Sequence, residues 1–565
     1  MDLIIKNGYV FDPKNGVDGD KADISIKDGK VVDEVKGSRA EVIDASGMLV
    51  MPGGVDLHSH IAGTKVNTAR LLRSEDHARD FKVKTKATRS GVGYSVPSTF
   101  LTGYRYSAMG YTTVFEPASP PLKTLHTHEE LNDIPLLDKA CYPTLGNNWL
   151  VMEYLRDGLL EECAAYVAWL FRRIKGYAIK IVNPGGVEKW KWGANVRGLD
   201  DEVPGFNITP REIIRGLCKV NRILGLPHSI HVHSNRLGVP GNYSETLRTM
   251  DCVRDLAEGD EPAIHMTHIQ FVGYGGVDWA SVSSRADAIA GYVNKHRHVT
   301  VDMGQVIFTD TTTMTGDGPF QFQLHQLTGN RWINAGVEME GGGGIVPMYY
   351  RRSNYAHAVM WTIGLELALL VDDPWRVFMT TDNPNGGPFT FYPNVISWLM
   401  SKRPRERIMK RVPRLSRVRS NIGSIDREYT FYEVAIVTRA ATAKILGLEE
   451  KGHLGVGADA DVAVYDINPR ETDPARDYRK VRKALSRVAY TVKDGKIVVK
   501  NGEAVDSFPG RTYWVRPEVS EDIYDSVKPD LTGKFRNYYS IAMENYGVPE
   551  EYLPRSAPID VPQSG

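Results

Sequence analysis

The sequence predicts an α/β protein: a TIM-like (β/α)₈ barrel with a composite β-sandwich built from both termini, followed by a C-terminal extension. Two observations indicate this fold. In the middle of the chain, short apolar strands that end in polar residues alternate with helical stretches, which is typical of a parallel sheet. At the two ends, the chain instead carries two similar β-hairpin patterns.

The end segments predict one shared β-domain. An alternating strand near the N-terminus leads into the turn Asp28-Gly29, a pair that tolerates the positive φ of a tight hairpin. The same text, KDGK, recurs around Asp494-Gly495. Coincidence is the alternative, since such turns are common. We expect residues 1–52 and 431–506 to form one domain.

We expect residues 53–430 to form the barrel. About 330 residues of strand–helix repeats suit a (β/α)₈ barrel with insertions, whose chemistry lies at the C-terminal ends of the strands. Helical stretches such as Pro210–Leu224 and Ala356–Val371 separate the strands. The expected strands are Val55–His60, Tyr111–Glu116, Ala178–Asn183, Ser229–His233, Ile264–His268, Val299–Asp302 and Phe378–Asp382.

The chain after the barrel predicts a helix and then a tail. Phe431–Leu448 reads as the helix, with Gly447 near its end. Residues 507–565 are rich in tyrosine and proline and show little periodicity. Such a tail is either a disordered end or an arm that docks on a partner subunit, and its aromatic content favours docking.

Composition and charge exclude several classes of protein. The chain has 69 basic and 69 acidic residues, which argues against a strongly basic nucleic-acid binder and a polybasic membrane anchor. The most apolar long stretch contains Glu366 and falls short of the ~20 residues that span a bilayer. The N-terminus has no pattern typical of a secretory signal, so we expect a soluble cytoplasmic protein.

The 4 cysteines lie far apart, and no two of them form a CxxC motif. A cluster or zinc ribbon requires closely spaced thiolates, and a disulfide framework is typical of small secreted chains. We therefore expect no iron–sulfur cluster in this chain.

Residue types that bind metals stand at five predicted strand ends, beginning with His58 and His60. Residues two apart on a strand point to the same side, so both histidines can hold one ion. Lys180 is flanked by apolar strand residues, where a cation is costly to bury. It would reach the surface, pair with a carboxylate, or react with CO₂ to form a carbamate that can bridge two metal ions.

The other candidates are His233, His268 and Asp382. Both histidines lie nearest the ends of their strands, which favours them over His231 and His265. Asp382 could bind a metal, act as a base, or do both. Each residue alone has a structural alternative: a core histidine bonded to a carbonyl, or an aspartate that caps a helix. Their joint order at barrel strands one, four, five, six and eight predicts a metal site.

Several segments resemble the amidohydrolase superfamily: IIKNG, DISIKDGKVV and VIDASGMLVMPGGVDLHSH near the start, and GHLGVGADADVAVYD at 452–466. The resemblance extends from residue 1 to about 505 and implies the barrel and β-sandwich of dihydroorotases and hydantoinases. Other segments resemble the formylmethanofuran dehydrogenase A subunits: HSHIAGTKVN, YRYSAMGYTTVFEPASPPL, VNPGGVEKWKWGANV and AVMWTIGLELALLVDDPWRVFMTTDNPNGGPF.

The resemblance implies which residues hold which metal. The first metal would be held by His58, His60, a carboxylated Lys180 and Asp382. The second would be held by the carbamate, His233 and His268. Two Zn²⁺ ions are expected because N and O ligands suit zinc, while ligand type leaves other divalent metals open. One departure is Asn383, which stands where many amidohydrolases have a histidine.

The resemblance also implies the reaction and the partners. The enzyme would condense formate with the amine of methanofuran to give formylmethanofuran, and would hydrolyse it in reverse, with Asp382 as the catalytic proton carrier. It would work within a CO₂-reducing complex of methanogenesis, beside a formate dehydrogenase-like subunit that holds a molybdenum or tungsten pterin and iron–sulfur clusters. No pterin is expected in this chain.

Two groups of residues are candidates for substrate binding. Lys65, Asn67 and Arg70 follow the first histidine pair and could bind formate or the carboxylates of methanofuran. A solvated loop with a salt bridge is the alternative. Trp192 and Asn195 follow strand four and could cover the substrate, with core packing as their alternative.

Three other functions stay open at this point. The chain could be the corresponding subunit of the bacterial formyltransferase/hydrolase complex, which runs the hydrolysis. It could be a cyclic amidase similar to a hydantoinase. It could also be a non-catalytic scaffold, although all six ligand positions are filled.

Overall fold

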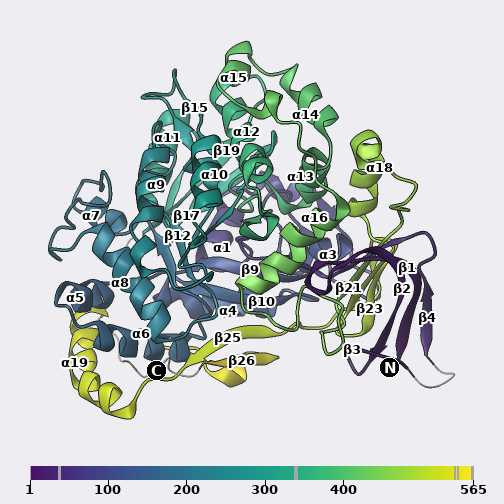
Figure 1. Ribbon diagram of the computed structural model, residues 1–565. Helices are drawn as coiled ribbons and strands as arrows, with labels where there is room; N and C mark the ends of the chain where they lie inside the picture. The colour runs from purple at the N-terminus through teal and green to yellow at the C-terminus, as the bar shows by residue number, and fades with distance from the viewer. Residues whose placement is uncertain (1, 36–39, 336–341, 540–542, 544–545, 562–565) are drawn as a thin grey trace.

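A barrel of parallel strands forms the centre of the computed structural model, which describes residues 2–35, 40–335, 342–539, 543 and 546–561 (Figure 1). In chain order, the barrel strands are β6 (Gly54–Asp56), β9 (Tyr111–Ser119), β10 (Asp138–Pro143), β11 (Lys180–Val182), β12 (Ile230–His233), β13 (Ile264–Met266), β16 (Val299–Asp302) and β20 (Val377–Phe378).

The barrel is closed by two parallel bridges between two arcs of strands. One arc has the order β6-β9-β10, and the other has the order β11-β12-β13-β16-β20. Thr144 pairs with Lys180 at one junction, and Ser59 pairs with Asn383 at the other. The predicted (β/α)₈ barrel is confirmed, and the C-terminal ends of all its strands meet on one face.

Strand β10 was not among the expected strands. It begins with Asp138 and Lys139, two charged residues that break the apolar pattern expected of a barrel strand. Both are fully buried: Asp138 pairs with Lys451, far away in the sequence, and Lys139 donates to the carbonyl of Ile134. Periodicity cannot reveal a strand that begins with a charge whose partner is so distant.

Helices surround the barrel (Figure 1). The two helices predicted within it are α8 (Pro210–Ile223) and α12 (Tyr355–Leu370), each within one residue of the expected bounds. In α8, Thr209 and Glu212 form a capping box that satisfies free backbone N–H groups at the helix start.

The remaining barrel helices are α1 (Thr64–Leu72), α2 (Glu75–Arg79), α3 (Thr99–Ala108), α4 (Thr124–Asn132), α5 (Trp149–Arg156), α6 (Leu160–Ile174), α7 (Gly186–Lys191), α9 (Tyr243–Asp251), α10 (Ala286–Lys295), α11 (Gly318–Thr328), α13 (Tyr392–Leu399), α14 (Lys402–Met409) and α15 (Arg414–Val418). Two small antiparallel sheets lie in its loops. They are formed by β7 (Phe81–Lys82) with β8 (Gly91–Val92), and by β17 (Asp310–Thr315), β18 (Ile333–Ala335) and β19 (Gly343–Tyr349). A third pair is β14 (Tyr274–Gly275) with β15 (Ser283–Ser284). No described helix has the length and apolar character required to cross a membrane.

The two ends of the chain form one nine-stranded sheet. Its N-terminal strands are β1 (Leu3–Asp12), β2 (Val17–Lys27), β3 (Lys30–Val32), β4 (Glu41–Asp44) and β5 (Leu49–Pro52). Its C-terminal strands are β21 (Val462–Tyr465), β22 (Tyr490–Lys493), β23 (Lys496–Lys500) and β24 (Glu503–Ala504). Strand β21 pairs antiparallel with β5, which joins the two ends.

Both predicted hairpins are present. Residues Asp28, Gly29, Asp494 and Gly495 all have positive φ, as a type I′ turn requires. Between the barrel and the second hairpin, the predicted helix is α16 (Phe431–Ala435), a π-helical turn η8 (Ile436–Ala440) and α17 (Ala441–Ile445). Helix α18 (Pro474–Ser486) packs on α13.

The C-terminal tail lies on the barrel of its own chain (Figure 1, yellow). Strand β25 (Thr512–Pro517) pairs with β10 and with β26 (Ser556–Val561), and helix α19 (Glu521–Tyr539) packs on α6. The rings of Trp169 and Tyr546 stack with centroids 6.2 Å apart. The aromatic residues therefore serve docking within the chain, and a contact of the tail with a partner subunit stays a prediction.

A buried ion cluster joins the barrel to the nine-stranded sheet. The Nζ atom of Lys451 lies 2.5 Å from Asp138, 2.9 Å from Asp459 and 2.7 Å from Asp461. Lys493 Nζ lies 3.0 Å from the same oxygen of Asp138. A buried charge without its partner is costly, so each member of this cluster depends on the others.

Replacing Asp138 with asparagine is expected to destabilise the fold by about 3–5 kcal/mol, because it removes one partner from a buried ion pair. The melting temperature measured by calorimetry should fall by several degrees. Asp560→Asn is the control, because Asp560 forms an exposed pair with Arg516 and its loss should leave the melting temperature unchanged. Equal melting temperatures for Asp138→Asn and the wild type would contradict a stabilising role of the cluster.

Candidate metal centre

The first histidine pair follows β6 and converges on a carboxylate. The Nε2 atoms of His58 and His60 lie 3.0 and 3.3 Å from the same oxygen, Oδ1 of Asp382. The backbone holds this geometry: the N–H of His60 donates to the carbonyl of Asn383 at 2.7 Å, and the Thr380 hydroxyl donates to the carbonyl of His58 at 2.8 Å. The expected convergence of the two side chains is therefore present.

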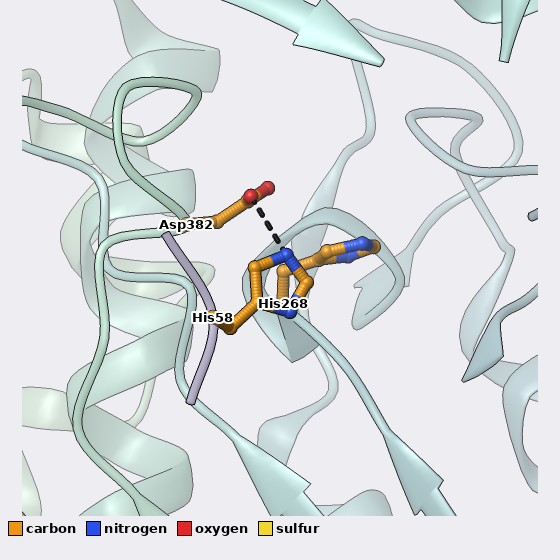
Figure 2. A group of neighbouring side chains, drawn as sticks. All are labelled: His58, His268 and Asp382. Atoms are coloured by element: carbon orange, nitrogen blue, oxygen red, sulfur yellow. Dashed lines mark ion pairs between the residues drawn. The ribbon is translucent and has the colours of Figure 1, made fainter. Parts of the chain in front are cut away.

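Asp382 and His268 each follow a barrel strand in a left-handed backbone conformation. Their φ angles are +49° and +38°, which is uncommon for residues other than glycine and is often found at functional sites. The ligand atoms of His58, His268 and Asp382 lie within 4.8 Å of one another, and all three residues are buried. Figure 2 shows His268 beside the ion pair of His58 and Asp382.

His233 ends β12 and faces His268, with ring centroids 4.8 Å apart. Its Nε2 atom lies 3.1 Å from Oδ2 of Asp317, in the loop before α11. A carboxylate that accepts from one ring nitrogen leaves the other nitrogen unprotonated and able to bind a metal. Asp317 was not among the predicted site residues.

Lys180 begins β11 and is buried, and its Nζ has no hydrogen-bond partner among the described residues. Burial lowers the pKa of Lys180 to about 7, although the charges of Asp382 and Asp302 act in the opposite direction. An amine that is neutral near pH 7 is the form that reacts with CO₂. An unpartnered buried amine next to this group of ligands fits a carbamate bridge.

Glu116, at the end of the second expected strand, contacts His60 on the ring nitrogen opposite the one that faces Asp382. Its Oε1 lies 2.9 Å from Nδ1 of His60, and Oε2 accepts the N–H groups of Ile61 and Ala62. Burial raises the pKa of Glu116, but the nearby His60 and Lys65 hold it below its ordinary value. A carboxylate on Nδ1 leaves Nε2 of His60 to face the site.

Asp302 ends the seventh barrel strand in a similar way. It accepts the N–H of His268 at 2.8 Å and contacts Nε2 of His265 at 3.1 Å. The ring of His265 therefore contacts Asp302, whereas the ring of His268 lies beside those of His58 and His233. Glu116 and Asp302 also stand at the ends of predicted strands. The pattern that predicted the candidate ligands, a polar residue at the end of a barrel strand, could therefore have indicated these two residues as well.

Among the predicted substrate residues, Lys65 forms an ion pair with Glu116, the partner of His60. Lys65, on α1, is buried, donates from Nζ to the carbonyl of Ala118, and lies 3.9 Å from Glu116. Asn67 is half-buried on the same helix. Arg70, also on this helix, forms a largely buried ion pair with Glu130 at 2.5 Å, and the role of these residues in substrate binding stays a prediction.

Trp192 and Asn195 lie just after α7. The Trp192 side chain is 71% exposed, so it is not packed in a core. Asn195 accepts a hydrogen bond from Asn183 at 3.3 Å, and Asn183 also donates to Asp317 at 3.0 Å. Asn195 is thereby linked to the surroundings of His233, while no described contact ties Trp192 to the site. Their role in substrate binding stays a prediction.

The barrel and the ligand types at its strand ends define a metal-dependent amidohydrolase-like protein, and comparisons with known proteins agree. A family model described as "Amidohydrolase family" matches residues 41–499. Protein FwdA of Methanocaldococcus jannaschii is 53% identical over 559 residues, covering 98% of this chain and 97% of that protein. The A-type subunit of the formyltransferase/hydrolase complex Fhc from Methylorubrum extorquens is 36% identical over 560 residues, with the same coverage.

A solved structure is also similar over the full length. The crystal structure of the formyltransferase/hydrolase complex FhcABCD from Methylorubrum extorquens, in complex with methylofuran, contains a chain that matches with a TM-score of 0.90. The identity is 34%, and each chain is covered to 100%. The chain belongs to the amidohydrolase family and, within it, to the formylmethanofuran dehydrogenase A subunits. The family predicted from the sequence is confirmed.

Proposed function

We infer that this chain is a dinuclear-zinc amidohydrolase that condenses formate with the amine of methanofuran and hydrolyses formylmethanofuran in reverse. The observation that carries this function is the buried, unpartnered Nζ of Lys180, on which the charge of Asp382 acts, together with the buried group of His58, His268 and Asp382. The 53% identity to FwdA over nearly the whole chain supports the choice of substrate.

The residues present fit two metal ions. One would be held by His58, His60, the carbamate of Lys180 and Asp382. The other would be held by the carbamate, His233 and His268. All these side chains are buried. Nitrogen and oxygen ligands of this kind suit zinc.

When bound, two such ions would polarise the carbonyl group and lower the pKa of an attacking water. Asp382 would accept the proton of that water and pass it to the amine nitrogen as the C–N bond breaks. In the synthetic direction, Asp382 would take one proton from the attacking amine and return it to the departing oxygen, which takes a second proton from solvent to leave as water. Burial raises the pKa of Asp382, but the nearby His58 and His268 hold it well below its ordinary value, which favours the basic form.

Synthesis of the amide requires a high local concentration of formate, because water at about 55 M opposes it by mass action. A cytoplasmic partner subunit that reduces CO₂ to formate would supply it, using a molybdenum or tungsten pterin and iron–sulfur clusters. The Fhc relative belongs to a multisubunit complex, FhcABCD, which supports assembly with further subunits. Four cysteines are buried and free, with no CxxC motif among them, so we place these cofactors in the partner: Cys141, Cys163, Cys218 and Cys252.

The formyltransferase/hydrolase complex is the second candidate, favoured by the TM-score of 0.90 to the structure with methylofuran. In that assembly the same site would run the hydrolysis. Copurification with a pterin-containing subunit would support the dehydrogenase, and copurification with a formyltransferase would support the rival.

The purified chain, prepared with bicarbonate and without chelators, is expected to contain about two zinc ions by elemental analysis. Removing them with a chelator should abolish hydrolysis of formylmethanofuran. Zinc and bicarbonate together should restore the activity more fully than zinc alone, because the carbamate requires CO₂. A metal-free chain that still hydrolyses formylmethanofuran would refute the proposed function, and a loaded chain without activity would support the scaffold.

A further inference from the structure

Three buried histidines form a continuous hydrogen-bonded relay from the candidate metal centre into the barrel. Nδ1 of His58 lies 2.8 Å from Nε2 of His231, which is 173 residues away in the sequence. Nδ1 of His231 lies 3.0 Å from Nε2 of His228. Nδ1 of His228 lies 2.9 Å from the backbone carbonyl of Ile445, in the last turn of α17.

The carbonyl of Ile445, at the end far from the metal centre, determines which ring nitrogen of each histidine donates its proton. A carbonyl oxygen only accepts hydrogen bonds, so His228 must carry its proton on Nδ1. Burial lowers the pKa of His228 to about 3, so its ring is neutral and Nε2 is an acceptor. His231 must then donate from Nδ1 and accept at Nε2, and His58 must in turn donate from Nδ1. The Nε2 atom of His58 is left with a free lone pair.

At its other end, the relay reaches the candidate metal centre. Nε2 of His58 faces Oδ1 of Asp382 at 3.0 Å. Because Nδ1 of His58 is engaged by His231, Nε2 is the nitrogen that would bind a metal ion held with Asp382.

We propose that His228 and His231 are positioning residues that fix the metal-binding tautomer of His58 through this relay, which ends at the carbonyl of Ile445. The inference rests on the proposed metal site and adds to it two residues outside the proposed set of metal ligands. Polar partners of a metal-bound histidine commonly set its tautomer and ring orientation, and losing one costs about 10–100-fold in metal affinity.

A second acceptor lies near Nδ1 of His58, and its effect on the tautomer of His58 must be distinguished from that of the relay. Oδ2 of Asp302 is 3.6 Å from Nδ1 of His58, longer than a hydrogen bond, and it is already in contact with His265. If Asp302 alone set the tautomer, changes at His228 would leave metal binding unaffected.

The test compares the zinc affinity of three full-length variants by competition with a chromophoric chelator. His228→Leu removes the acceptor for His231 and should weaken zinc binding by about 10–100-fold. His228→Gln keeps an oxygen that accepts this bond and should retain the wild-type affinity. His128→Leu is the matched control: His128 is a buried histidine that contacts the carbonyl of Ile174 at 3.1 Å and lies outside the ligand group.

The outcomes separate the relay from the metal site. Equal affinities for His228→Leu and His228→Gln, both folded by circular dichroism, would overturn the relay alone. ¹⁵N spectra of the zinc-loaded wild type, labelled at histidine, give a second measurement that needs no variant. They should show Nδ1-protonated His228 and His231, and the other tautomer on either ring would overturn the relay. A wild-type chain that takes up no zinc would overturn the proposed function and the relay together.

Discussion

Lys180→Met is expected to abolish zinc binding at both sites, because the variant lacks the amine that becomes the bridging carbamate. Hydrolysis of formylmethanofuran should fall about a thousandfold or more. A metal acting as a Lewis acid is worth several kcal/mol, and about 1.4 kcal/mol corresponds to a factor of ten. Zinc content by elemental analysis and turnover of formylmethanofuran measure the two effects on one preparation.

Lys139→Met is the matched control for this prediction. Lys139 is also buried in a barrel strand, and burial lowers its pKa to about 7, as it does for Lys180. Its Nζ atom, however, donates to the carbonyl of Ile134 at 2.9 Å and lies outside the ligand group. The control should therefore keep its zinc. Full activity and normal zinc in Lys180→Met would refute the assignment of the bridging ligand.

Asp382→Asn is expected to lower kcat by about 10²–10⁴-fold, the usual contribution of a general acid–base group. The amide keeps an oxygen in place of Oδ1, which His58 and His60 both approach, so the folded structure should survive. Bound zinc should fall by less than in Lys180→Met, because the other ligands of both metals remain. Steady-state kinetics on formylmethanofuran, with zinc content measured in parallel, separate the loss of the base from the loss of a ligand.

Glu366→Gln is the control for replacing a buried carboxylate by an amide. Glu366 lies on α12 and accepts the N–H groups of Asn421 and Ile422, away from the ligand group. Its kcat should match that of the wild type. If Asp382→Asn also kept the wild-type kcat, with zinc bound, another residue would have to carry the proton.

Much of the fold was predictable because the chain repeats simple patterns. Strands that end in polar residues, the separating helices and the Asp-Gly hairpins are local features, and the structure confirms them. Strand β10 was missed because its charges are compensated by residues such as Lys451, far away in the sequence. The placement of the tail on its own barrel likewise depends on contacts with β10 and α6 that no local pattern contains.

The candidate site likewise contains some residues that the sequence pattern predicts and others that only distant contacts reveal. His58 and Asp382 could be proposed from the sequence because a metal ligand at the end of a barrel strand has a recognisable type and position. Lys180 could be proposed because a lysine among apolar strand residues is costly to bury as a cation. Residues such as Asp317 contact a candidate ligand through one hydrogen bond, and their own sequence context is that of an ordinary loop.

The sequence by itself determined the barrel, the shared β-domain and the ligand types at the strand ends, because these follow from periodicity, turn chemistry and the side chains that metals prefer. Only the tertiary structure decided which nitrogen of each histidine faces the site and which partner holds it there. A hydrogen bond such as that between His58 and His231 joins segments far apart in the chain, and it exists only after the barrel has closed.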